Sequence, residues 1–237
     1  MHDNVAFARF PRPIGASLIL SIASQYRMRF VNVLALLALG IAPSAAAQDG
    51  AAGRYRLVGE QDVASELILR KDGSFEYFLM AGSLDEHAKG KWTANGARLY
   101  LETLPIPKPA VFVMGAGSTS TTAPLTVNVR WPDGRGIAGV DVEIGFDAGE
   151  VLTDYTQEYG WSLSGDEARR PLWIKLRVPM HRLVSERFTI DTAISNALSF
   201  TLVPNDLGAL DFRNYFLEVL PGRLVINRDG SHLIYKK

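Results

Sequence analysis

Short runs in which apolar and polar residues alternate, separated by Gly, Pro, Asn and Asp, follow one another from residue 53 onward. A period of two is typical of strands with one buried face, because successive side chains of a strand point to opposite sides. No stretch in this part of the chain keeps a helical period long enough for a core helix. The pattern therefore predicts an all-β protein.

The first block, residues 53–104, is predicted to be an antiparallel meander. Asp72-Gly73 and Asn95-Gly96 are dipeptides that tolerate the positive φ angles of hairpin turns. Between and around these turns the alternation predicts five strands, at residues 53–58, 66–70, 74–79, 88–93 and 98–102.

A linker rich in Pro, Gly, Ser and Thr is expected over residues 105–124. Its apolar centre, Ala110 to Met114, has two interpretations. It is an edge strand or a loop packed on the barrel, or it is a lid over an apolar ligand pocket.

The second block, residues 125–203, opens with two alternating segments joined by a turn. Val127 and Val129 share one face of the first segment, and Val140, Val142 and Ile144 share one face of the second. The block resembles the carboxypeptidase-regulatory-like, transthyretin-like β-sandwich. The matching residues are Gly136, Ile137, Gly139, Val140 and Val142, followed by Thr156, Gly160 and Trp161.

The resemblance implies an Ig-like or transthyretin-like sandwich and no particular activity, since such modules serve many exported proteins. The first block resembles small bacterial lipocalin-like β modules through its Asp-Gly turns and Gly90-Lys91-Trp92. Ligand transport is not inferred from this second resemblance, because in lipocalins the corresponding motif lies on the first strand. The expected architecture is a small barrel-like meander followed by a β-sandwich.

A short internal sequence repeat links the first block to the C-terminal region. Residues 224–231 repeat the pattern of residues 67–74, with its Asp-Gly turn. We therefore expect residues 214–236 to complete the first block, which would make the sandwich an insertion.

The N-terminal region predicts export. Arg29, the apolar run 31–42 and the small residues Ala45 and Ala47 give residues 28–47 the pattern of a cleaved signal peptide. Translation is then expected to start at Met28, with residues 1–27 as an upstream leader. The alternative is a membrane anchor, for which each apolar stretch is short compared with the roughly 20 residues of a span. Cleavage would leave a periplasmic or secreted protein without a stable membrane span.

The charge balance and the absence of cysteine exclude several classes of function. The chain has 25 basic and 25 acidic residues, so a nucleic-acid partner is not expected. It contains no Cys, which excludes disulfides, thiolate catalysis, Cys-ligated zinc and acylation of a lipobox cysteine.

Candidate chemistry is sparse, and no cofactor or metal is predicted. His87, His181 and His232 lie in different blocks, without the close spacing of a metal site. Ser162 to Gly165 lacks the first glycine of a hydrolase nucleophile elbow. The chain is therefore not predicted to be an enzyme.

Aromatic residues supply the candidate ligand or partner surface. Tyr155, Tyr159 and Trp161 are spaced for one face of a single strand, and Trp92 could join them. The alternative is that these side chains pack in the core or between domains.

Three hypotheses follow for function. The first is a noncatalytic exported β protein that acts as an interaction or accessory module of the bacterial envelope. The second is a binding protein for a small apolar ligand in the barrel. The third is a hydrolase, which would need one of the three histidines to meet carboxylates in space. The partner is accordingly an unidentified protein or a small apolar ligand.

Overall fold

A computed structural model describes residues 50–228 and 230–237. The predicted signal peptide and leader lie outside these residues. As the sequence predicts, the fold is all-β, with a closed barrel and further sheets. No helix in the described ranges is both long and apolar enough to span a membrane.

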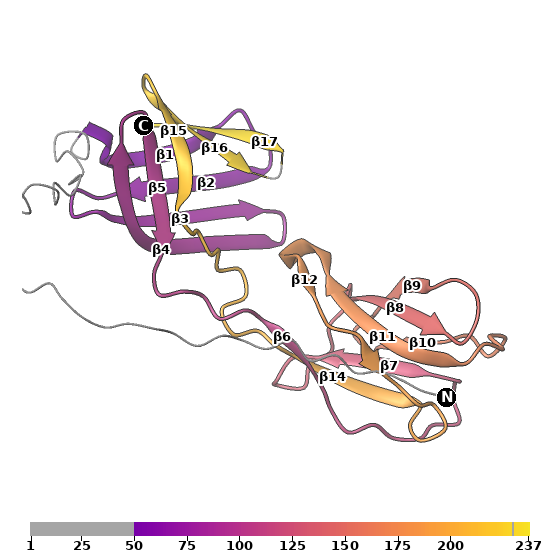
Figure 1. The fold of residues 1–237 in the computed structure, drawn as a ribbon. Coiled ribbons are helices and arrows are strands. Elements are labelled where there is room, and N and C mark those ends of the chain that lie inside the picture. Colours follow the sequence, from indigo (N-terminus) through magenta and orange to yellow (C-terminus); the bar gives the residue numbers. More distant parts are fainter. Residues whose placement is uncertain (1–49, 229) are drawn as a thin grey trace, which may run out of the picture. The chain divides into compact units, whose positions relative to one another are not determined.

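Eight strands close the barrel, and they come from two distant parts of the chain (Figure 1). Their order around the barrel is β1-β17-β16-β15-β5-β4-β3-β2. The N-terminal strands are β1 (Gly53–Val58), β2 (Val63–Leu69), β3 (Ser74–Ala81), β4 (Leu84–Asn95) and β5 (Arg98–Thr103). The C-terminal strands are β15 (Tyr215–Leu220), β16 (Arg223–Arg228) and β17 (Ser231–Lys236).

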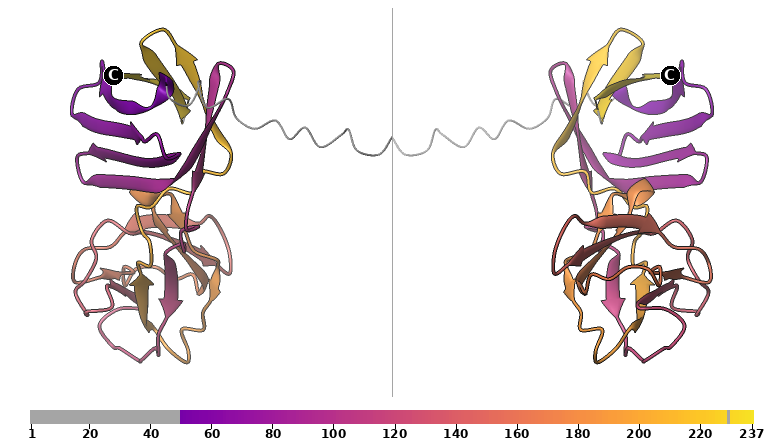
Figure 2. Two further views of the ribbon diagram at one scale, coloured as in Figure 1. Left: turned by 90° about the vertical axis from the view of Figure 1, so that its left-hand side faces the viewer. Right: turned by 90° about the vertical axis from the view of Figure 1, so that its right-hand side faces the viewer.

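Two antiparallel seams join these segments. Leu57 on β1 pairs with Tyr235 on β17, and Leu99 on β5 pairs with Leu217 on β15. Figure 2 shows the yellow C-terminal strands beside the indigo and magenta ones from two sides. The C-terminal strands thus complete the sheet of the first block, and the intervening segment is an insertion.

The barrel interior is filled by side chains. Large apolar residues that alternate along the strands form one buried cluster, and Trp92, a member of this cluster, is only 1% exposed. The indole Nε1 of Trp92 donates a hydrogen bond to the carbonyl oxygen of Arg70 at 2.9 Å. Burying the polar atom of an aromatic residue is favourable only with such a partner. Trp92 is therefore a core residue of the barrel, and the prediction that it joins a ligand surface is wrong.

Hydrogen bonds also hold the segment that leads from β14 of the insertion back to β15 of the barrel. The amide of Leu210 donates a hydrogen bond to the backbone carbonyl of His87 on β4. The amide of Thr103 on β5 donates to the backbone carbonyl of Phe212. Phe212 is buried in the barrel cluster, where its ring packs edge-on against Tyr77. This segment therefore covers one end of the barrel before β15 begins.

The inserted region is a β-sandwich with two sheets. One has the order β10-β7-β14-β6, and the other has the order β12-β11-β8-β9 with β13 paired to β11. The strands are β6 (Val111–Met114), β7 (Thr126–Arg130), β8 (Asp141–Phe146), β9 (Leu152–Tyr155), β10 (Trp161–Ser162), β11 (Pro171–Val178), β12 (Leu183–Val184), β13 (Phe188–Thr189) and β14 (Ala197–Val203). A 3-10 turn, η1 (Pro179–His181), precedes β12.

The predicted linker contains one of these strands. β6 pairs antiparallel with β14 at the edge of its sheet, and Phe112 is buried in the sandwich core. The edge-strand interpretation of Ala110 to Met114 is therefore correct, although the strand belongs to the sandwich and not to the barrel. A lid over a barrel pocket is ruled out for this segment, because its buried side chains pack elsewhere.

Candidate binding sites

Residues 155–161, which we call the tyrosine turn, connect β9 in one sheet of the sandwich to β10 in the other. Thr156 fixes this turn, because it is fully buried and its hydroxyl donates to the carbonyl of Ile137 at 2.7 Å. The same hydroxyl accepts a hydrogen bond from the amide of Val140, whose carbonyl accepts the amide of Thr156. The turn is thus anchored directly in the sandwich core.

Close backbone approach holds the rest of the turn. Gln157 and Gly160 exchange two backbone hydrogen bonds, and Gly160 has a φ of 103°, which favours glycine. A Cβ on Gly136 would lie 1.7 Å from the carbonyl oxygen of Glu158. These contacts give a structural reason for the Thr, Gly and Gly residues that the sequence pattern singled out.

The aromatic side chains of the tyrosine turn differ in exposure. Tyr155 is 56% exposed and Tyr159 is 84% exposed, whereas Trp161 is partly buried against the sandwich core. The indole Nε1 of Trp161 donates to Oδ2 of Asp154 at 2.7 Å. The core-packing interpretation is therefore wrong for both tyrosines.

The predicted arrangement on one strand face is also wrong. Tyr155 ends β9, which pairs with β8, while Trp161 begins β10, which pairs with β7. The chain changes sheets between them, because Thr156 turns inward and Gly160 adopts a positive φ. The bond between Trp161 and Asp154 still keeps the two strand ends together.

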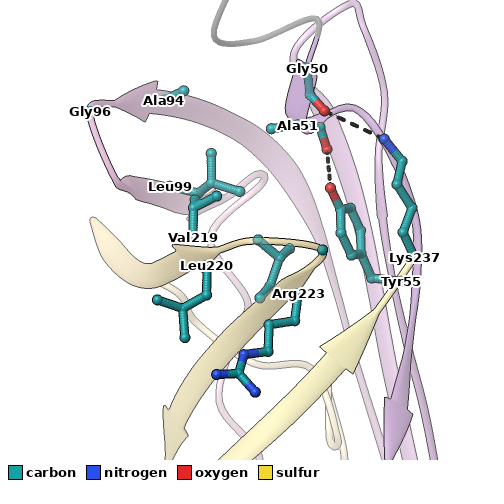
Figure 3. Close-up of a pocket in the computed structure, with 12 residues that line it drawn as sticks. Gly50, Ala51, Tyr55, Ala94, Gly96, Leu99, Val219, Leu220, Arg223 and Lys237 are labelled. Atoms are coloured by element: carbon teal, nitrogen blue, oxygen red, sulfur yellow. Dashed lines mark hydrogen bonds between the residues drawn. The ribbon is translucent and has the colours of Figure 1, made fainter.

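A second candidate site is a pocket of about 320 Å³ at one mouth of the barrel (Figure 3). It lies between the β4–β5 and β15–β16 hairpins, which are joined by a hydrogen bond from the amide of Val219 to the carbonyl of Ala97. Leu99, Val219 and Leu224 contribute apolar lining from these hairpins. We call this site the barrel-mouth pocket.

The opposite wall of the barrel-mouth pocket is polar. The hydroxyl of Tyr55 donates to the carbonyl of Ala51 at 2.7 Å, as the dashed line in Figure 3 shows. Burial raises the pKa of the Tyr55 hydroxyl above its ordinary value. Nζ of Lys237 lies 3.4 Å from the carbonyl oxygen of Gly50 and 5.8 Å from the centre of the Tyr55 ring.

The other end of the barrel holds a buried ion pair. Nη2 of Arg228 donates to Oε1 of Glu86 at 2.6 Å, and Nη1 of Arg228 bonds to the other carboxylate oxygen. Burial opposes the charge of Arg228, but the hydrogen bonds and the charge of Glu86 outweigh it and raise its pKa. The two side chains satisfy each other, so the pair offers no free charge to a ligand.

Buried hydroxyls accompany this ion pair. The hydroxyls of Ser65 and Tyr235 are 2.7 Å apart, and Ser65 also donates to the carbonyl of Phe78. Burial is the main cause that raises the pKa of Tyr235. Sequence patterning missed this cluster, because the strands that carry it are far apart in the chain.

The three histidines considered as catalytic or metal-binding candidates are not brought together. His87 lies on β4, His181 ends η1, and Nδ1 of His232 on β17 contacts Oδ1 of Asn227. In the residues placed by the structure, no group of three or more His, Asp or Glu side chains is arranged to hold a metal ion.

No protein-family model matches the chain, and no curated protein or solved structure gives a match.

Proposed function

We propose that this chain is a noncatalytic exported β protein that acts as an interaction module of the bacterial envelope, and that the tyrosine turn is its contact surface. The observation that carries the proposal is the contrast within that turn. Its backbone is anchored by the buried Thr156, while Tyr155 and Tyr159 project into solvent.

Exposed tyrosines on an anchored backbone suit recognition for a physical reason. A tyrosine offers a large amphipathic contact area but has only two side-chain torsions to immobilise on binding. A turn fixed by core hydrogen bonds adds little further ordering cost. Tyr155 and Tyr159 therefore present preorganised contact area, which scattered exposed apolar residues do not.

The resemblance to carboxypeptidase-regulatory-like modules is part of this proposal. Thr156 and Gly160, two residues that carry the resemblance, have structural tasks in the turn. The tyrosines next to them are not needed for those tasks. We infer that the turn is a scaffold feature and that its tyrosines add the binding specificity.

The test compares capture of envelope components by the wild-type chain and by the double variant Tyr155→Ser, Tyr159→Ser. The matched control is Ile194→Ser, which removes a 74% exposed apolar side chain from another loop of the sandwich. We expect specific components to be captured by the wild type and the control but lost with the double variant. Equal capture by all three proteins would contradict the proposal.

A further inference from the structure

A row of like charges crosses the outer surface of the barrel beside the barrel-mouth pocket. Lys236 on β17 is the direct cross-strand partner of both Arg56 on β1 and Arg223 on β16. Like charges at directly opposed positions of neighbouring strands destabilise a sheet. A bound anion beside this row would reduce the repulsion.

Carboxylates neutralise only one end of this row. The carboxylate of Glu66 accepts hydrogen bonds from Nε of Arg56 at 3.1 Å and from Nη1 of Arg54 at 2.9 Å. One carboxylate therefore already pairs with two guanidinium groups. Within residues 50–228 and 230–237, no ion pair joins Arg223, Lys236 or Lys237 to a carboxylate. We call these three residues the cationic rim.

The cationic rim meets the apolar lining at the barrel-mouth pocket. Arg223 and Lys237 both line the pocket, together with Leu99, Val219 and Leu220 (Figure 3). The barrel interior beyond is filled by side chains such as Trp92, so an apolar group can occupy the mouth but cannot pass deeper. Pockets of about 300 Å³ and more, with a few polar groups, are typical of small-molecule sites.

We propose that the barrel-mouth pocket binds a small anionic amphiphile, with its apolar tail against Val219 and Leu220 and its anionic head on the cationic rim. The tail removes apolar surface from water, and the head relieves the repulsion among the rim cations. This site lies on the barrel and is separate from the tyrosine turn, so either proposal can fail alone.

The probe is octanoate, titrated into the purified chain and followed by calorimetry and by the NMR amide shifts of glycines. Gly96 and Gly222 line the pocket and should shift, whereas Gly134 of the sandwich should not. Two control ligands separate the parts of octanoate. Acetate has the carboxylate head without the long alkyl tail, and octan-1-ol has the alkyl tail without the carboxylate. Both should bind several-fold more weakly than octanoate, since each lacks one part of the site.

Variants assign the two parts of the site. Arg223→Gln with Lys237→Gln should weaken octanoate binding about tenfold, because each exposed cation contributes roughly two- to fivefold. Leu220→Glu places a like charge beside the tail and should abolish measurable binding. Lys91→Gln removes an exposed cation outside this pocket and should leave the affinity unchanged.

Three results would overturn the proposal. They are the absence of shifts at Gly96 and Gly222, unchanged octanoate affinity in the double glutamine variant, and equal binding of octan-1-ol. Binding of the chain to phosphatidylglycerol vesicles is measured in a separate experiment. Rim-dependent binding to vesicles without binding of free octanoate would also refute a small-molecule site and indicate a membrane-docking surface.

Discussion

The barrel and the sandwich have similar strand patterns, but the chain supplies their cores in different ways. The sandwich uses one continuous stretch, from β6 to β14. The barrel needs both ends of the described chain, because β1 and β5 complete their pairing only with β17 and β15. The barrel therefore depends on pairing between strands far apart in the sequence, whereas the sandwich is formed by one continuous segment.

Their cores also differ in polarity. The barrel encloses the Glu86–Arg228 pair and the Ser65–Tyr235 contact, while Thr156 is the buried polar residue of the sandwich. A buried ion pair is costly to break, because one charge is then left without compensation. The barrel should therefore be the more sensitive region to changes in buried polar groups.

The largest expected effect follows from removing the closing strands. Deleting residues 222–237 removes β16 and β17 and exposes the edges of β1 and β15, so the barrel should unfold or aggregate. Hydrogen exchange should show loss of protection over residues 53–103 and retained protection over β7, β8, β11 and β14. If the barrel strands stay protected in the truncated chain, the barrel does not depend on its C-terminal strands.

The second-largest expected effect is the loss of stability on breaking the buried pair of Glu86 and Arg228. Arg228→Met leaves Glu86 buried and uncompensated, which should cost about 3–5 kcal/mol of barrel stability. Urea unfolding followed at barrel and sandwich amides measures this loss, and the sandwich should be unaffected.

Two controls sharpen this measurement. Arg135→Met breaks the exposed pair with Asp133 and should change stability by less than about 1 kcal/mol. Adding Glu86→Gln to Arg228→Met should restore part of the loss, since the uncompensated charge is then removed. A loss for Arg228→Met no larger than that of the surface control would show that the pair is not desolvated.

The sandwich has its own test in Thr156. Thr156→Val keeps the volume but leaves the carbonyl of Ile137 and the amide of Val140 without their hydroxyl partner. We expect a loss of about 2 kcal/mol in the sandwich transition alone. Thr153→Val, at an exposed position of β9, is the control and should be nearly neutral.

The smallest effect concerns pH. Hydrogen bonds from Arg169 lower the pKa of Glu167 to about 2. A lowered pKa in the folded state gives stability that is present above the ordinary value of about 4.5 and is lost as the pH falls toward 2. NMR titration should show this carboxylate titrating near pH 2, and Arg169→Gln should return it toward 4.5. An ordinary pKa for Glu167 in the wild type would refute the contact.

Local patterns predicted much of the fold. The Asp72-Gly73 and Asn95-Gly96 turns lie where expected, between β2 and β3 and between β4 and β5. The β6 strand was harder to place, because Pro109 and Gly115 enclose only a short apolar run. Its pairing with β14 depends on a distant segment that no local signal specifies.

The candidate sites were less predictable. Spacing placed Tyr155 and Trp161 on one strand, but a period of two holds only while the backbone stays extended. The inward turn of Thr156 and the positive φ of Gly160 end that extension. The barrel-mouth pocket joins Tyr55, Leu99 and Val219, which no sequence window contains.

The central claim is that the C-terminal strands close the barrel of the first block. Amide-to-amide nuclear Overhauser effects in the intact chain test it most directly, because they report strand pairing itself. We expect cross-strand contacts between β1 and β17 around Leu57 and Tyr235, and between β5 and β15 around Leu99 and Leu217. Contacts within β1–β5 and within β15–β17, with none across the two seams, would contradict it and leave separate sheets.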